Sequence, residues 1–354
     1  MAAYTTIDDP EAYFQVQLYT GNGSANHAIT LGGDTDMQPD IVWIKNRDAT
    51  DNHQLFDAVR GATKRLEPNI GEGGSEAETT DADTLDSFTS DGFQVDADVK
   101  VNTNTEKYVA WCWKANGSGS SNTAGTINTT ATSANTTSGV SIMTYTGNGT
   151  NGATLGHGIG IVPHMMIVKH RETADEWWDT YHQALGNTHV LFLNQTDAKS
   201  DQSYFYDTTP SSTLVTVAGV GSINDSGELY VMYVFAPVQG FSKFGSYIGN
   251  ASTDGPFIYT GFRPAFVLIK RSSDGTNQWS LSDNKRGVNG AIGTLTPDST
   301  EQEYTPADQI DHLSNGFKIR QSAAARNATG ATYIYMAFAE APFVNSNGVP
   351  CNAR

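Results

Sequence analysis

The residues best suited to metal chemistry are five histidines in the middle of the chain. They are His157, His164, His170, His182 and His189. A zinc site needs three or four convergent ligands, usually with short paired spacings. These histidines do not form such pairs with one another or with a cysteine. The pattern therefore favours histidines in turns or at the surface, and it predicts no metal site.

A second candidate for metal binding is an acidic turn. Asp34, Asp36 and Asp40 lie close together, and calcium takes clustered carboxylate oxygens as ligands. The loop signature of an EF-hand is absent from the sequence. We therefore expect a solvated acidic turn here and no bound calcium.

Paired carboxylates can hydrolyse glycosides. Glu172, Asp175 and Glu176 form an acidic group just before two tryptophans. The chain carries 38 acidic residues, so three of them in one turn are a weak pattern. The sequence contains no nucleophile elbow, phosphate-binding loop or dinucleotide fingerprint. We therefore predict no catalytic residue, no cofactor and no enzymatic activity.

Aromatic residues in loops could bind a sugar, because an aromatic ring stacks on the apolar face of a pyranose. Trp177, Trp178, Tyr181 and Trp279 lie in segments that read as loops or sheet edges. These four are the candidate glycan contacts. The two cysteines, Cys112 and Cys351, are predicted to be free thiols, since a disulfide scaffold has more cysteines in a smaller chain.

The formal net charge of −17 excludes one class of partner. An acidic surface without a basic stripe repels the phosphates of DNA and RNA. No apolar run approaches the ~18 residues that a membrane span needs. The first residues have neither the basic nor the apolar region of a signal peptide, so we expect synthesis in a cytoplasm.

Four landmarks recur in the same order in three stretches of the chain. Each stretch opens on an aromatic-x-Gly-Asn phrase, where x is any residue, at residues 19–22, 145–148 and 247–250. Each then has a proline and an apolar run that ends in lysine, namely Lys45, Lys169 and Lys270. A glycine follows (Gly61, Gly186 and Gly287), and an aromatic-rich run closes each stretch, at residues 108–113, 230–235 and 333–338. A solenoid repeat has about 20–50 residues, so these longer units are predicted to be whole domains.

The apolar runs are short and rich in β-branched and aromatic residues, which is typical of strands. Clusters of Gly, Asn, Ser and Thr between them mark turns. We predict an all-β protein of three tandem homologous β-sandwich domains of jelly-roll-like type. Each landmark lysine is expected to end a strand, with its stem packed and its charge in water.

The predicted boundaries follow from these landmarks and from composition. They are an N-terminal arm (1–14), repeat 1 (15–114), a Gly/Ser/Thr/Asn-rich linker (115–138), repeat 2 (139–240), repeat 3 (241–343) and a C-terminal tail (344–354). The linker has too few large apolar residues for a core, so a flexible tether is expected. An extended strip on a neighbouring subunit is the alternative. Phe241 and Phe244 are expected at the junction of repeats 2 and 3.

Several of these phrases resemble a family of uncharacterised repeat proteins of tailed bacteriophages, many of them marine or cyanobacterial phages. The phrases are residues 4–10, 19–23, 145–149, 240–247 and 343–350 and the runs from proline to lysine. The resemblance implies a virion component, commonly labelled a tail fibre or other structural protein. It supplies no catalytic residue.

The resemblance and the residues together predict a non-enzymatic virion structural protein of tail-fibre or adhesin type. Its expected partners are other virion proteins, further copies of itself and a glycan of the host surface, with no nucleic acid. A capsid decoration or head-fibre protein is the first alternative. A carbohydrate-binding module and a depolymerase are the others, and Glu172, Asp175 and Glu176 would be the residues to mutate in a depolymerase.

Overall fold

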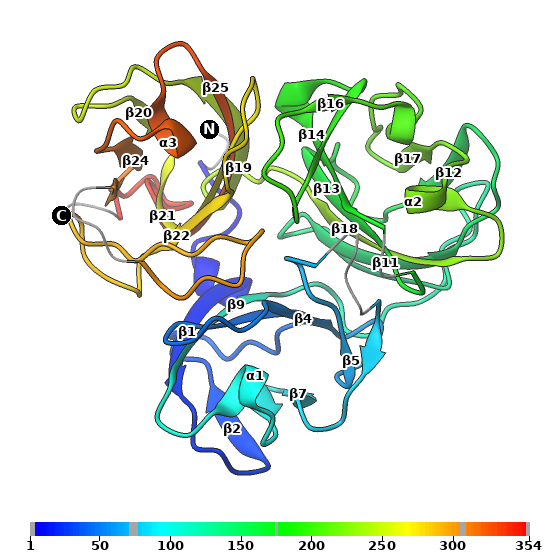
Figure 1. Cartoon of the computed structure of the whole chain (residues 1–354), viewed down its shortest axis with the longest axis horizontal. Helices are drawn as coiled ribbons and strands as arrows, with labels where there is room; N and C mark the ends of the chain where they lie inside the picture. The colour runs from blue at the N-terminus through cyan, green and yellow to red at the C-terminus, as the bar shows by residue number, and fades with distance from the viewer. Residues whose placement is uncertain (1–3, 71–76, 174–175, 305–308, 352–354) are drawn as a thin grey trace.

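The structure is a computed structural model that describes residues 4–70, 77–173, 176–304 and 309–351. Strands hold 41% of the residues and helices 6%, which confirms the predicted all-β fold class. No helix in these ranges is long and apolar enough to cross a membrane. Figure 1 shows three lobes around a common centre, one for each repeat.

Repeat 1 follows the short 3-10 helix η1 (Pro10–Ala12). Its elements are β1 (Phe14–Thr20), β2 (His27–Thr30), β3 (Ile41–Asn46), β4 (Gln54–Asp57), β5 (Lys64–Arg65), β6 (Thr79–Thr80), β7 (Leu85–Thr89), β8 (Gly92–Val95), α1 (Val99–Asn102) and β9 (Lys107–Trp113).

Repeat 2 is preceded by β10 (Ala131–Asn135). Its elements are β11 (Val140–Thr146), β12 (Ala153–Gly156), β13 (Met165–His170), β14 (Trp178–His182), η2 (Gln183–Leu185), β15 (His189–Phe192), β16 (Ser200–Asp201), η3 (Ser203–Phe205), β17 (Leu214–Val217), α2 (Gly221–Asn224) and β18 (Leu229–Phe235).

Repeat 3 has a similar order of elements. They are β19 (Ser242–Ile248), β20 (Phe257–Tyr259), β21 (Phe262–Arg271), β22 (Ser280–Asp283), β23 (Ile310–Leu313), β24 (Gly316–Ile319), α3 (Ala324–Asn327) and β25 (Thr332–Pro342).

The main sheets of the three repeats share one strand order. It is β1-β9-β3-β4 in repeat 1 and β19-β25-β21-β22 in repeat 3. Repeat 2 contains the equivalent β11-β18-β13-β14 within a sheet that continues at both edges. A smaller sheet accompanies each main sheet: β2-β8-β7, β12-β17 and β20-β24-β23. Equivalent stretches of sequence therefore take equivalent places in the three lobes.

The segment 115–138 is part of the lobe of repeat 2. Strand β10 pairs antiparallel with β11, and Ile127 forms a bridge to Leu155 and is buried in the core of that lobe. The prediction of a flexible tether is therefore wrong. Backbone hydrogen bonds to a neighbouring strand compensate for the shortage of large apolar side chains.

The aromatic-x-Gly-Asn phrase is explained by a close backbone crossing. At Gly21 a Cβ atom would lie 2.1 Å from the carbonyl oxygen of Thr103. The equivalent distances are 2.1 Å at Gly147 and 2.2 Å at Gly249. No other residue type fits such an approach, because the chain just after each short helix occupies that space.

A buried asparagine at the end of each short helix holds the same crossing. Asn102 Oδ1 accepts from the backbone N–H of Asn22 at 2.9 Å, and Asn102 Nδ2 donates to the carbonyl of Ser24 at 2.9 Å. Asn224 and Asn327 make the corresponding bonds, and all three side chains are fully buried. The sequence analysis identified the first asparagine of each pair and missed the second.

Replacing Asn102 with alanine is expected to cost about 2–3 kcal/mol of folding free energy. The change removes the acceptor of the Asn22 N–H and leaves the carbonyls of Ser24 and Asp96 without their donor. Urea unfolding followed by tryptophan fluorescence measures the loss. The matched control is Asn104→Ala, because Asn104 is exposed in the turn that follows. An equal loss in both variants would contradict this role.

The first tyrosine of each repeat stacks on the tyrosine that opens its closing strand. The ring centroids lie 5.0 Å apart for Tyr19 and Tyr108, 5.2 Å for Tyr145 and Tyr230, and 4.9 Å for Tyr247 and Tyr333. Each hydroxyl donates to a carbonyl of the short helix at 2.5–2.8 Å. The tyrosines are therefore part of the core of each lobe.

The landmark lysines were predicted to hold their charges in water, and this prediction is wrong. Lys45, Lys169 and Lys270 are at most 2% exposed. Each ammonium group donates to backbone carbonyls of the turn that follows, for example Lys45 to Asn46 and Ala49 at 2.8 and 3.0 Å. Burial lowers the pKa of both Lys45 and Lys270 to about 8. The lysine is retained because it supplies donors to a buried turn whose carbonyls would otherwise lack them.

The three main sheets meet along a pseudo-threefold axis. Equivalent residues of the three closing strands, Trp113, Phe235 and Phe338, form a triangle with centroid distances of 6.3, 5.8 and 6.1 Å. A small apolar cavity of about 30 Å³ lies beside them. The inward faces of the sheets thus form one shared core that runs through all three repeats.

The prediction that each repeat has a core of its own is therefore wrong for these inward faces. It holds for the outward sides of repeats 1 and 2, which contain separate buried clusters between their main and smaller sheets. The prediction failed because the strands are apolar on both faces. Such a run is compatible with a partner on either side, and the sequence does not say which repeat supplies it.

A second set of equivalent residues links each repeat to the next around the ring. His53, Trp178 and Trp279 immediately precede or begin the fourth strand of their main sheets. The His53 ring contacts the carbonyl of Thr296 at 3.1 Å, Trp178 Nε1 donates to that of Glu67 at 3.2 Å, and Trp279 Nε1 donates to that of Phe192 at 3.0 Å. The contacts run from repeat 1 to repeat 3, from repeat 2 to repeat 1 and from repeat 3 to repeat 2. They therefore join the three repeats in a closed ring.

Among the residues that the structure describes, two of the three interfaces contain a buried ion pair. Arg60 binds Asp57 at 2.6 Å and Glu78 at 3.2 Å, and Glu78 also binds Arg171 of repeat 2 through two bonds of 2.8 Å. The hydroxyl of Tyr233 in repeat 2 donates to Asp57 at 2.7 Å. Repeat 2 therefore supplies hydrogen-bonding partners, Arg171 and Tyr233, to the buried charged groups of repeat 1.

The interface between repeats 3 and 1 has the same plan. Arg286 binds Asp283 at 2.6 Å and Glu303 at 3.2 Å, and Glu303 also binds Arg47 of repeat 1. Trp111 Nε1 of repeat 1 donates to Asp283 at 2.9 Å. A buried acid and arginine, capped by an aromatic donor from the next repeat, thus occur twice.

At the third interface, between repeats 2 and 3, other residue types replace the acid, the arginine and the aromatic donor. His182 and Leu185 stand where Asp57 and Arg60 stand in repeat 1, and Met336 stands in the place of Tyr233. His182 Nε2 contacts the carbonyl of Tyr335 at 3.1 Å. Because donor and acceptor change together, the loss of the arginine leaves no buried carboxylate at the position of Asp57.

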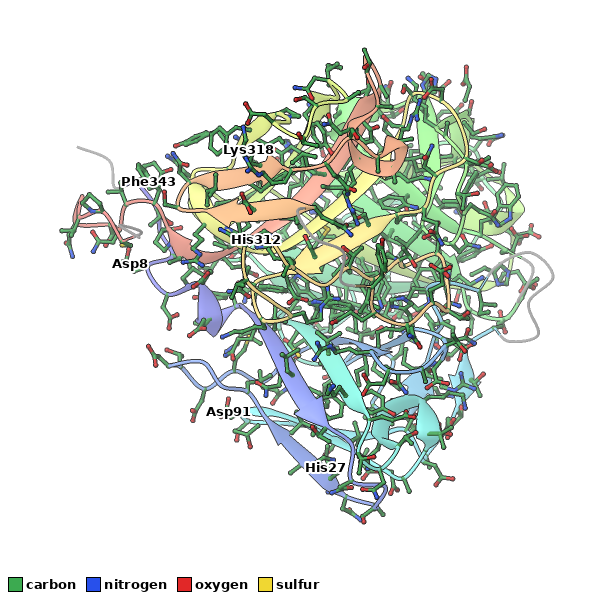
Figure 2. The ribbon with its side chains drawn as sticks, turned by 60° about the vertical axis from the view of Figure 1, so that its left-hand side comes forward. Asp8, His27, Asp91, His312, Lys318 and Phe343 are labelled. Carbon is green, nitrogen blue, oxygen red and sulfur yellow. The ribbon has the colours of Figure 1, made fainter. Side chains whose placement is uncertain are left out.

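The two chain ends lie on the lobe of repeat 3. Asp8 accepts from the backbone N–H of Ser346 at 2.6 Å, and Figure 2 shows Asp8 and Phe343 close together on one side of the molecule. Phe244 packs beside His164 and His182 of repeat 2, with centroids 6.3 and 6.5 Å apart. This confirms the expected junction at Phe244, while Phe241 packs on Tyr13 and Phe338.

Candidate binding site

Three of the four candidate glycan contacts are buried. Trp178, Tyr181 and Trp279 are at most 2% exposed, and Trp177 is half-buried with its ring 4.3 Å from that of Phe192. Trp177 and Trp279 lie outside strands, as predicted, whereas Trp178 and Tyr181 belong to β14, which has a neighbouring strand on both sides. Trp178 and Trp279 instead donate to neighbouring repeats, so their rings do not lie open at the surface.

Two residues of the acidic group near them, Glu172 and Glu176, take part in hydrogen bonds. Glu172 accepts from the backbone N–H of Leu229 at 2.9 Å, and the carbonyl of Glu176 accepts from Lys169. Asp175 lies outside the described residues. Partial desolvation and the neighbouring Glu172 carboxylate raise the pKa of Glu228. Glu172 thus binds the first residue of strand β18, beside the partly exposed Glu228.

The histidines are more buried than expected. His157, His170 and His182 are at most 3% exposed, against the prediction of turn or surface positions. His157 Nε2 contacts the carbonyl of Ser211 at 3.2 Å, and His170 Nδ1 accepts from the N–H of Thr173 at 3.0 Å. Within the described ranges, no three His, Cys, Asp or Glu side chains gather as metal ligands.

The acidic turn and the cysteines also have structural positions. Asp40 is buried and accepts from the backbone N–H of Ala115 at 2.8 Å, while Asp34 and Asp36 are exposed. The carboxylate of Asp40 therefore points into the protein, whereas Asp34 and Asp36 are exposed to solvent. Cys112 and Cys351 are free thiols, as predicted.

One buried carboxyl that the sequence analysis missed is Asp179 in β14. Neither of its oxygens has a hydrogen-bonding partner among the described residues. Burial, partly offset by Ser222 and reinforced by the charge of Glu176, raises its pKa to about 8. A perturbed carboxyl can mark an active site, but this side chain is fully buried. No substrate could reach it in this conformation.

A polar hollow lies on repeat 3. It has a volume of about 420 Å³ and is lined by residues from β22, α3 and the segments between them. The lining residues are Gln278, Trp279, Ser280, Thr294, Thr296, Glu301, Gln302, Tyr304, Gln309, Gln321, Ala323, Ala325 and Arg326. Amides and hydroxyls predominate, and Arg326 is the cation among them. We refer to this hollow as the Arg326 pocket.

Arg326 is held in the pocket by neutral acceptors. Its Nη2 donates to Thr294 Oγ1 at 3.1 Å, its Nε to Ser280 Oγ, and its Nη1 to Gln309 Oε1. The side chain is 7% exposed. Burial lowers the pKa of its guanidinium to about 10, which still leaves the group charged at neutral pH.

Among the residues that the pocket contains, Trp279 alone was identified from the sequence. Trp279 lines the pocket, and its indole N–H is used at the repeat interface. A comparison of the three repeats in the sequence would have singled out Arg326. The residue before the buried asparagine of the short helix is Val101 in repeat 1, Ile223 in repeat 2 and arginine only in repeat 3. A charged residue at an otherwise apolar position is informative.

Comparison with known proteins gives one family. Searches of curated proteins and of solved structures find no match. A family model matches residues 9–342, which include all three repeats. The chain therefore belongs to the family described as Domain of unknown function (DUF7483).

Proposed function

We propose that the protein is a non-enzymatic virion structural protein of tail-fibre or adhesin type. The observation that carries this proposal is how the reactive side chains are used. Arginines, carboxylates and histidines that could have formed an active site bind backbone or one another at the repeat interfaces. Such a scaffold is suited to holding surface loops in place.

The sequence resemblance to phage repeat proteins supports the same function. It supplies the virion context, the expected partners among other virion proteins or copies of this chain, and contact with the host surface. The net charge of −17 suits a protein that stays apart from nucleic acid. A capsid decoration or head-fibre protein would use the same scaffold at another place on the particle.

A carbohydrate-binding module is the second candidate, and the Arg326 pocket favours it. The pocket has the volume of a small-ligand site and offers several amides and hydroxyls. A depolymerase is less well supported, since the carboxylate of Glu172 is bound to the backbone N–H of Leu229. The binding candidate is compatible with an adhesin, since an adhesin binds without hydrolysis.

Labelling of intact virus particles tests the proposal. With gold-conjugated antibodies against the full chain, we expect label at the distal part of the tail and peptides of this chain in purified particles. Label on the head would replace the tail-fibre role by the decoration or head-fibre alternative. Particles that carry neither label nor peptides of this chain would contradict a virion role altogether.

A further inference from the structure

Arg326 is exceptional among the buried arginines of this protein. Arg60, Arg65, Arg286 and Arg326 are each at most 9% exposed. Arg60 and Arg286 each bind two carboxylates, and Arg65 binds Glu67 at 2.6 Å and Asp81 at 3.1 Å. Within the described parts of the chain, Arg326 has only the hydroxyls of Ser280 and Thr294 and the amide of Gln309 as side-chain partners.

A buried cation without a counter-ion is costly, because burial removes its hydration and nothing of opposite charge replaces it. In this acidic chain, 38 carboxylate residues were available to neutralise it. The three contacts use three of the five N–H groups of a guanidinium. Two donors and one positive charge therefore remain for an anion that enters the pocket.

The equivalent residues of repeat 1 show how this neighbourhood can be neutralised. Arg65 precedes Leu66, which bridges to Leu55, and Thr294 precedes Leu295, which bridges to Leu281 in the same way. Two residues on, repeat 1 has Glu67 and repeat 3 has Thr296. In repeat 1 the arginine of this neighbourhood is Arg65, and Glu67 neutralises it. In repeat 3 the arginine is Arg326 from α3, and Thr296 stands at the position of Glu67.

The remaining lining indicates which anion fits. Gln278, Gln302 and Gln321 provide amides that both donate and accept, as the hydroxyls of a sugar require. Tyr304, 66% exposed, offers a ring at the rim. Glu301 also lines the pocket and would repel a multiply charged ligand such as phosphate more strongly than a singly charged one. A singly charged, polyhydroxylated molecule satisfies all of these groups.

We propose that the Arg326 pocket binds the carboxylate of an acidic saccharide, of the hexuronic acid type, through the guanidinium of Arg326. The carboxylate takes the place of the counter-ion that the described residues do not supply. The sugar hydroxyls bond to the glutamine amides, and the ring lies against Tyr304. The site belongs to repeat 3 alone, since Val101 and Ile223 occupy its key position in the other repeats.

Titration of the full-length protein with galacturonate tests this proposal, with isothermal calorimetry and saturation-transfer NMR as readouts. Galactose, which differs by the carboxylate, and inorganic phosphate are the comparison ligands. We expect galacturonate to bind about tenfold more tightly than galactose, since a charged hydrogen-bonded pair contributes at least that factor. Equal binding of the two sugars, no binding of galacturonate, or tighter binding of phosphate would overturn the proposal.

Two variants and a matched control assign the site. Arg326→Ile introduces the residue type of repeat 2 and is expected to lose about tenfold or more in affinity for galacturonate. Arg320→Gln removes one positive charge from the same lobe outside the pocket and is expected to bind normally. Because Arg326→Ile could unfold the lobe, Tyr304→Ala at the exposed rim is a second variant. Unchanged affinity in Tyr304→Ala and a folded Arg326→Ile would place binding elsewhere and overturn the assignment.

The inference deepens the proposed function and relies on it only for the origin of the saccharide on a host surface. The two fail separately. Binding of galacturonate by a protein that is absent from virus particles would leave the pocket assigned and refute the virion role. Labelled particles that carry a protein without affinity for galacturonate would do the reverse.

Discussion

Replacing Arg60 with leucine is expected to destabilise the folded protein by about 3–5 kcal/mol. The change leaves the carboxylate of Asp57 buried without its cation, and it removes one of the two arginines that bind Glu78. Tyr233 would still donate to Asp57, but a neutral donor does not balance a buried charge. Urea unfolding followed by tryptophan fluorescence measures the loss.

The third interface provides the matched control. A triple variant, Asp57→His with Arg60→Leu and Tyr233→Met, gives the first interface the residues of the His182, Leu185 and Met336 interface. We expect this triple variant to recover most of the stability that Arg60→Leu loses, because it leaves no unpaired charge. A triple variant less stable than Arg60→Leu alone would show that the ion pair is not what holds this interface together.

Replacing Asp179 with asparagine is expected to stabilise the protein at pH 8, by roughly 3–5 kcal/mol relative to the parent chain. The pKa of Asp179 is about 8 in the folded protein, against its ordinary value of 3.8. Between these two values the folded state holds a proton that the unfolded state has released. The stability of the parent therefore falls as pH rises from about 4 to about 8.

Unfolding measured between pH 5 and pH 9 tests this expectation. The gain in Asp179→Asn should grow with pH and level off above pH 8, since Asp179 is then ionised in both states. Asp179→Ser, with the residue that repeat 3 has at Ser280, should give the same pH dependence. A gain that does not change with pH would show that Asp179 is not protonated in the folded protein.

The sequence predicted the elements of this fold well and their partners poorly. The apolar runs that end at Lys45, Lys169 and Lys270 are strands β3, β13 and β21. Their period and their turns are local properties that can be read from neighbouring residues. The shared axis at Trp113, Phe235 and Phe338 could not be predicted, since it depends on which faces meet.

The burial of charged residues was the main source of error. The sequence analysis placed the landmark lysines in water and the histidines in turns, because such residues are mostly exposed. The structure buries them where a turn carbonyl or a neighbouring repeat supplies a partner. The candidate site could have been found by comparing Val101, Ile223 and Arg326, because the difference between repeats identifies the position that changed its role.

The closed order of contacts has a practical consequence for work on fragments. Heterologous contacts that close after three members leave no unpaired face. Excision of any one repeat would expose the apolar inward sheets of the other two, and such surfaces associate. Truncated forms are therefore expected to form aggregates or to reassemble in threes, and crystallisation or display of this protein calls for the intact ring.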